Sequence, residues 1–235
     1  MSGLLPYLSL QITAFAVVIA LFSCFFRIRK PWWLLACLVY MLLDLLVLFI
    51  TPQLPHVAWN WSGKIASAVL ACIAIPLLRI SPEEAGLTLP RSRSALLRSA
   101  VGTLLAVLCA VVISAFGRSH QWPSSETLWF EATMPGFSEE LAYRCIAFAL
   151  FARCFVVPSQ KWAWIPPVLG PTLFFALGHG FTFQHFTPQI QWLPLGYAFG
   201  MGLILATIRL LSKSLLGSVI AHNAANLMSF VVDGI

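Results

Sequence analysis

Long apolar segments recur along the whole chain and constrain its fold more than any other feature of the sequence. Runs of roughly 18 or more apolar residues can cross a hydrocarbon layer about 30 Å thick as helices. Of the 235 residues, 60% are hydrophobic and only 9% are charged, whereas a soluble domain carries about 25% charged residues. Because so few charges cannot cover a water-facing surface, we expect a single transmembrane domain over residues 1–235.

The apolar segments predict helices and not strands. An open sheet cannot satisfy its backbone hydrogen bonds in lipid, and the alternating ten-residue segments of a membrane barrel are absent. We therefore expect an all-α polytopic membrane protein with about eight transmembrane helices. Hydropathy places these spans at about 4–26, 32–51, 64–79, 97–117, 134–156, 162–181, 190–210 and 214–231.

Basic residues gather at alternate connections between the predicted spans. Eleven of the fourteen lysines and arginines lie at the first, third, fifth and seventh connections, and the opposite side carries only Lys64 and Arg118. By the positive-inside rule, both termini face away from the cytoplasm and residues 119–131 form an external loop. We expect a protein of the bacterial inner (plasma) membrane. The basic residues form no patch with interleaved aromatics, so no nucleic-acid partner is predicted.

Ionisable and polar residues cluster in three of the C-terminal spans. An ionisable group at mid-membrane costs roughly 2.5–3.5 kcal/mol on insertion scales, so each one requires a partner or a function. The clustered residues are Glu139, Glu140, Arg144, His179, His222 and Asn226. An aromatic residue, Phe175, lies four positions before His179.

Helical spacing separates the two adjacent glutamates by role. Glu140 and Arg144 lie four residues apart, share a helix face and can neutralise each other. Glu139 is rotated by about 100° from Glu140, so it can point elsewhere and remain free for chemistry. The same spacing of four places the ring of Phe175 under the imidazole of His179.

The predicted topology brings these residues to a similar depth. Glu139 and His179 lie near the outer ends of their spans, and His222 and Asn226 lie somewhat deeper on a neighbouring span. We therefore expect one shared polar site in the outer half of the bilayer.

Three motifs in this order resemble those of the CPBP family, which joins CAAX prenyl endopeptidases and bacteriocin-processing or immunity proteins. The motifs are Glu-Glu-x-x-x-Arg at 139–144, Phe-x-x-x-His at 175–179 and His-x-x-x-Asn at 222–226. The resemblance covers about the C-terminal 100 residues, with a motif-bearing core at about 134–231. It implies an eight-helix fold and a glutamic-type intramembrane endopeptidase that acts on a membrane-anchored protein or peptide within the lipid bilayer.

The resemblance also implies a role for each motif residue. Glu139 is the general base that activates a water, His179 is its partner, and His222 and Asn226 donate to the oxyanion. Arg144 is the structural ion-pair partner of Glu140. A glutamate and two imidazoles in an apolar cavity suit this chemistry, and no serine or cysteine nucleophile and no cofactor are required.

The residues alone leave three alternatives open. Glu139, His179 and His222 are all zinc-ligand types, although no His-Glu-x-x-His motif is present. Intramembrane Glu, His and Arg also form proton or ion relays in transporters, although no inverted repeat is detected. The same residues could also be a structural network in a non-catalytic membrane partner.

Overall fold

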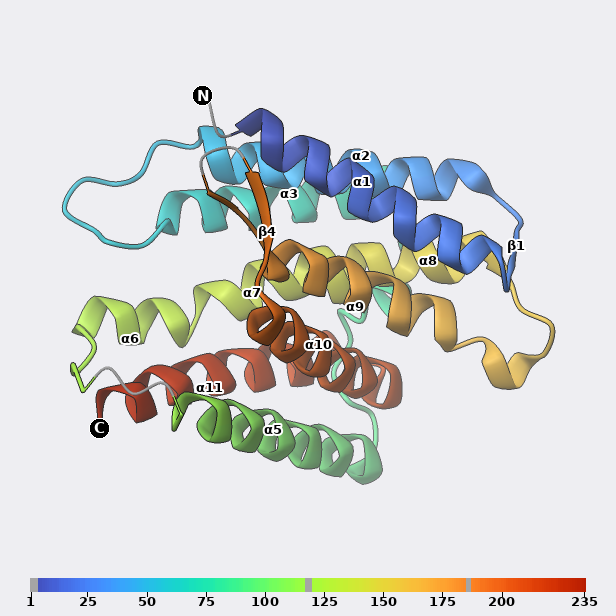
Figure 1. Cartoon of the computed structure of the whole chain (residues 1–235). Coiled ribbons are helices and arrows are strands. Elements are labelled where there is room, and N and C mark those ends of the chain that lie inside the picture. Colours follow the sequence, from blue (N-terminus) through green and yellow to red (C-terminus); the bar gives the residue numbers. More distant parts are fainter. Residues whose placement is uncertain (1–3, 117–119, 185–186) are drawn as a thin grey trace.

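The computed structural model describes residues 4–116, 120–184 and 187–235, and most of these residues are helical (Figure 1). Arg118, the end of the fourth predicted span and the start of the predicted external loop lie outside the described residues. The long helices are α1 (Leu4–Ser23), α2 (Pro31–Ile50), α3 (Trp61–Leu77), α5 (Arg93–Ser114), α9 (Ile165–Gly180), α10 (Trp192–Ser212) and α11 (Leu215–Gly234).

The fifth predicted span consists of three consecutive helical pieces. They are α7 (Met134–Glu140), the π-helical segment η1 (Leu141–Ala147) and α8 (Phe148–Cys154). The wider π-helical turn begins directly after the paired glutamates. Such turns are rare and often lie at functional sites.

The all-α membrane fold is confirmed. Among the described residues, five helices are long and apolar enough to cross a membrane: α1, α2, α5, α10 and α11. Helix α3 has 17 residues and α9 has 16, which corresponds to about 24–26 Å at the rise of a regular helix. The count of eight spans therefore stays a prediction, although a helical segment occupies each of the eight ranges.

Several short elements lie in the connections or at the edges of the predicted spans, and a short strand replaces helix at residues 155–156, the end of the fifth predicted span. They are α4 (Pro82–Ala85), α6 (Ser125–Glu131), η2 (Gln160–Trp162), and the antiparallel pairs β1 (Arg27–Ile28) with β2 (Phe155–Val156) and β3 (Phe181–Gln184) with β4 (Thr187–Ile190). Each strand pair begins next to a helix end, where the backbone leaves the helical pattern and satisfies its hydrogen bonds by pairing. Helix α6 falls inside the predicted external loop.

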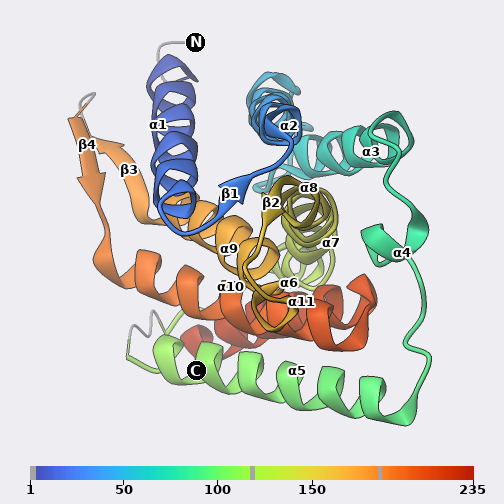
Figure 2. The same cartoon turned by 90° about the vertical axis from the view of Figure 1, so that its right-hand side faces the viewer.

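The helices form two groups around the continuous segment of α7, η1 and α8, which we call the central rod. In Figure 2, α1, α2 and α3 lie on one side of α7 and α8, and α5, α10 and α11 lie on the other. Figure 1 shows the C-terminus and the start of α1 at one end of the bundle, with β1 at the opposite end. This agrees with an even number of crossings.

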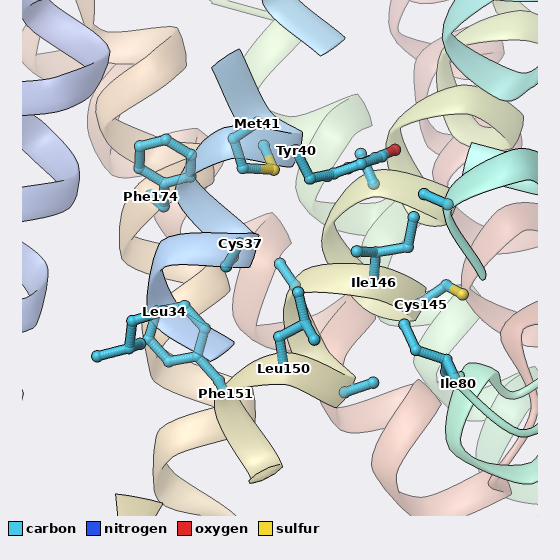
Figure 3. Close-up of a cluster of buried hydrophobic side chains, with 14 of the residues drawn as sticks. Leu34, Cys37, Tyr40, Met41, Ile80, Cys145, Ile146, Leu150, Phe151 and Phe174 are labelled. Carbon is cyan, nitrogen blue, oxygen red and sulfur yellow. The ribbon is translucent and has the colours of Figure 1, made fainter. Parts of the chain in front are cut away.

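Close packing of α2 against the central rod fixes one half of the bundle. Leu34, Cys37 and Met41 of α2 face Ile146 and Leu150 of η1 and α8 (Figure 3). By contrast, the outward side chains of the bundle are large and apolar, as a lipid-facing surface requires; examples are Leu35, Val39, Leu104 and Val112.

Single introduced cysteines test the orientation of this fold. In a chain without its native cysteines, Gln53→Cys and Ser125→Cys should react with a membrane-impermeant maleimide from outside the cell. Gln160→Cys, at the opposite end of the bundle, should react only after the membrane is permeabilised. The reverse labelling pattern would invert the predicted topology and place residues 119–131 on the cytoplasmic side.

Candidate active site

A buried ion pair lies at the end of α7. The Glu140 side chain is fully buried, and its Oε1 accepts a hydrogen bond from Nη1 of Arg144 at 2.8 Å. The guanidinium of Arg144 is also buried and lies over the ring of Phe175, 4.6 Å from its centroid. The two opposite charges neutralise each other, which lets both stay inside the bundle.

His222 extends this ion pair from α11. Its Nδ1 lies 2.9 Å from Oε1 of Glu140, so the same carboxylate oxygen binds both Arg144 and the imidazole. Because a carboxylate only accepts, Nδ1 of His222 carries a proton and donates it. In the neutral ring, Nε2 is then unprotonated and can accept a hydrogen bond.

His179 is oriented in the same way from α9. Its Nδ1 lies 2.9 Å from the carbonyl oxygen of Phe175, one helical turn earlier, and donates to it. The rings of Phe175 and His179 are 4.2 Å apart, centroid to centroid, and the edge of the Phe175 ring also meets His222 at 6.2 Å. Phe175 therefore supports both imidazoles, and the neutral His179 also presents Nε2 as an acceptor.

Glu139 faces both free imidazole nitrogens. Its Oε2 lies 3.9 Å from Nε2 of His179 and 3.8 Å from Nε2 of His222. These separations are too long for direct hydrogen bonds, but a water placed between the three atoms could donate one hydrogen to Glu139 and the other to one of the imidazoles. The residues line a cavity of about 210 Å³, to which Asn226 and apolar residues of α10 also contribute.

Asn226 has one of its amide hydrogens already engaged. Its Nδ2 donates to Oε2 of Glu131 at 3.0 Å, and Glu131 is buried at the end of α6. This bond fixes the amide at the edge of the cavity and leaves the second N–H of Asn226 for another acceptor. Glu131 was not predicted to be a site residue, because the sequence placed it in the external loop at 119–131.

Lys64 is a second residue that sequence reasoning missed. Its Nζ lies 2.5 Å from Oε1 of Glu139, so the glutamate that Arg144 leaves free has an ammonium group as its partner. From the sequence, Lys64 was predicted only to be one of the few basic residues on the outer side. The signal was nevertheless present, because a lysine inside an apolar segment requires a partner of opposite charge.

An amide clamp joins the start of α7 to α11. Oδ1 of Asn223 accepts from the backbone N–H of Gly136 at 2.8 Å, and Nδ2 of Asn223 donates to the carbonyl oxygen of Thr133 at 3.1 Å. The first N–H groups of a helix have no partner within it, so the side chain supplies one. A Cβ at Gly136 would collide with Asn223. The clamp sets the spacing between Glu139 and His222.

The three candidate zinc ligands face one another but are widely spaced. Tetrahedral ligands with bonds of about 2.0–2.1 Å are about 3.3 Å apart, whereas the carboxylate oxygen of Glu139 is 3.8–3.9 Å from the two nitrogens. Among the described residues, no group of three His, Cys, Asp or Glu is placed to hold a metal ion. The ammonium group of Lys64 beside Glu139 would also repel a dication.

Removing Arg144 tests the importance of the buried pair. Arg144→Met should lower the free energy of unfolding in detergent by about 3–5 kcal/mol, because it leaves the carboxylate of Glu140 buried without its cation. The double variant Glu140→Gln with Arg144→Met should recover part of this loss. Arg93→Met, at an exposed position, is the control. An unchanged unfolding midpoint in Arg144→Met would contradict this account.

A comparison with protein-family models relates this site to known proteins. A model described as Rce1-like, type II CAAX prenyl endopeptidase, matches residues 120–228. The matched segment extends from the connection before α6 into α11 and contains Glu139, His179, His222 and Asn226, whereas Lys64 lies outside it. Searches of curated proteins and of solved structures gave no match.

Proposed function

We propose that the chain, whose residues 120–228 match the family model of Rce1-like type II CAAX prenyl endopeptidases, hydrolyses a peptide bond of a membrane-anchored protein by a glutamate-activated water. The family is a protease family, and the apolar helices make the chain an integral membrane protein.

The placement of Glu139 is the observation that supports this proposal. One oxygen of its carboxylate faces Nε2 of His179 and Nε2 of His222 at 3.8–3.9 Å, at the wall of a cavity of about 210 Å³. A carboxylate and an imidazole acceptor on either side of one position can hold and polarise a water molecule, which donates one hydrogen to Glu139 and the other to His179. The other carboxylate oxygen is held by Lys64.

The proposed reaction needs no covalent enzyme intermediate. Glu139 takes a proton from the water while the water oxygen attacks the carbonyl carbon, and the electron pair of the C=O bond moves onto its oxygen. When the intermediate collapses, the C–N bond breaks and Glu139 returns the proton to the leaving nitrogen. During the first step the negative charge moves from Glu139 to the oxyanion, while the ammonium charge of Lys64 stays in place to balance it.

Asn226 and His222 are the proposed oxyanion donors. Asn226 retains one N–H after donating to Glu131. His222 has its Nδ1–H directed at Glu140, so it can donate into the cavity only when Nε2 is also protonated.

The proposed substrates are exported proteins with a C-terminal membrane anchor. The cavity lies toward the end of the bundle that carries α6 and the connection between α2 and α3, which the distribution of basic residues assigns to the outer side. Cysteine labelling of Gln53, Ser125 and Gln160 tests this assignment independently of cleavage.

Glu139→Gln tests the proposed base. In vesicles that contain the purified protein and single-span reporter proteins, this variant should lose at least about 10² of the cleavage rate, because the amide cannot accept the proton. Asp233→Asn makes the same chemical change outside the cavity lining and should leave the rate unchanged. Cleavage at the wild-type rate by Glu139→Gln would contradict the mechanism and favour one of the non-catalytic alternatives.

Lys64 should also support the rate through its charge. Lys64→Met leaves Glu139 without its ammonium partner and should slow cleavage of the same reporter by about tenfold or more, comparable to the loss of a charged hydrogen bond. Lys64→Arg keeps the charge and should retain more activity than Lys64→Met. Equal rates for the two variants would show that the charge has no role.

Metal analysis separates the glutamate mechanism from the zinc alternative. The purified active protein should contain far less than one zinc per chain, and a zinc chelator should leave reporter cleavage unchanged, since the proposed water is activated by Glu139 and not by a metal. Loss of activity with the chelator, followed by recovery on adding zinc, would assign Glu139, His179 and His222 as ligands instead.

A further inference from the structure

A second cavity lies at the opposite end of α10 from the candidate active site. It has a volume of about 710 Å³ and is bounded by α4, the first turns of α5, α8 and the last turn of α10. The candidate active site uses α10 from Pro194 to Leu205, whereas this second cavity uses the segment from Arg209 to Lys213. In Figure 2 the end of α10 lies between α4 and the start of α5, which the segment after α4 joins.

Positive charge predominates in this second cavity. Arg91, Arg98, Arg209 and Lys213 line it together with two glutamates, Glu83 and Glu84. Glu84 is neutralised from outside the cavity, because Nη2 of Arg153 lies 2.6 Å from its Oε2 and lowers the pKa of Glu84 to about 2.

The second glutamate compensates only one of the four cations. Oε1 of Glu83 lies 3.7 Å from Nη2 of Arg91, and both side chains are largely exposed, so water weakens this pair. Among the described residues, neither Arg98 nor Lys213 has a carboxylate within ion-pair distance. The cavity wall therefore carries an excess of positive charge.

Arg209 is the cation of this cavity wall that hydrogen bonds hold in a fixed position. Its side chain is only 4% exposed, and Nη2 donates to the backbone carbonyls of Glu83 and Glu84 at 3.3 and 2.7 Å. Nε has no partner in the part of the chain that the structure describes. Gly86, at φ +73°, makes this placement possible, because a Cβ there would collide with the guanidinium. A buried cation with no carboxylate partner suits an anionic ligand.

An apolar groove continues from the cavity along the outside of the bundle. It has a volume of about 440 Å³, lies between α5 and α10, and shares Arg98 and Leu211 with the cavity. Its walls include Leu97, Val101 and Leu105 of α5 and Leu203, Ile204 and Thr207 of α10. A cationic cavity that opens into an apolar groove matches a ligand with an anionic head and a hydrocarbon chain.

We propose that the cavity and the groove together bind one anionic phospholipid. Its phosphate contacts Arg98, Arg209 and Lys213, and one acyl chain lies in the groove between α5 and α10. Basic pockets between transmembrane helices bind anionic lipid headgroups in this manner. A free phosphate would use the cavity alone, so the groove favours a lipid as the ligand. The bound lipid connects α5 to α10, the helix that also lines the candidate active site.

Lipid binding to the full-length protein tests this proposal without a substrate. The detergent-purified chain is titrated with phosphatidylglycerol, phosphatidylcholine or inorganic phosphate, and bound lipid is counted by native mass spectrometry. The wild type should retain one phosphatidylglycerol with at least about tenfold preference over phosphatidylcholine, since only the former has net negative charge. Glu139→Gln should bind phosphatidylglycerol like the wild type, which separates this result from the outcome of the cleavage experiment.

Two sets of variants separate the headgroup from the acyl chain. Arg98→Ala with Lys213→Ala should weaken phosphatidylglycerol binding by about tenfold or more. Arg27→Ala with Lys161→Ala removes the same charge at the same end of the bundle but outside the cavity, and should bind normally. Thr207→Trp fills the groove and should weaken binding of the lipid.

Three results would overturn the proposal. The first is equal binding of the two lipids. The second is unchanged phosphatidylglycerol binding by Arg98→Ala with Lys213→Ala, or an equal loss in Arg27→Ala with Lys161→Ala. The third is that inorganic phosphate binds as strongly as phosphatidylglycerol and that Thr207→Trp leaves phosphatidylglycerol binding unchanged. This result would identify a site for a free anion.

Discussion

The pairing of buried charges is the constraint on which the rest of the structure depends. Two glutamates stand next to each other in an apolar bundle, and each has a separate cation: Arg144 for Glu140 and Lys64 for Glu139. An unpaired charge at this depth would be costly, so the helices that carry the partners must approach α7 closely. The position of α3 beside α7 and the burial of Arg144 next to Phe175 both follow from this requirement.

The same pairing gives the two glutamates different environments. Oε1 of Glu140 is shared between Arg144 and His222, and this carboxylate has no exposed surface. Glu139 uses one oxygen for Lys64 and presents the other to the cavity. Glu140 is therefore inaccessible, whereas one carboxylate oxygen of Glu139 remains accessible from the cavity.

Local sequence patterns predicted the contacts within single helices well. The spacing of four residues predicted both the Glu140–Arg144 pair and the placement of Phe175 beneath His179, because helix geometry alone fixes these neighbours. Residues in separate spans, such as Glu139 and His222, were expected to meet because each is costly in lipid, and the structure places them around one cavity.

Contacts between distant segments could not be predicted in this way. Lys64 was interpreted as a topology signal, and nothing in its surroundings in the sequence shows that its partner is Glu139, 75 residues later. Glu131 was assigned to a loop because helix α6 is too short to give a periodic pattern. The clamp formed by Asn223 depends on how closely α11 approaches the start of α7, which is decided by packing and not by local propensity.

The central claim is that Glu139, His179 and His222 surround a single water-holding position inside the membrane bundle. A density map of the purified protein in lipid, at a resolution that shows ordered water, tests this claim most directly. We expect a peak within about 3 Å of Oε2 of Glu139 and of at least one of the two imidazole Nε2 atoms. Hydrocarbon packed between the carboxylate and the two rings would contradict the account.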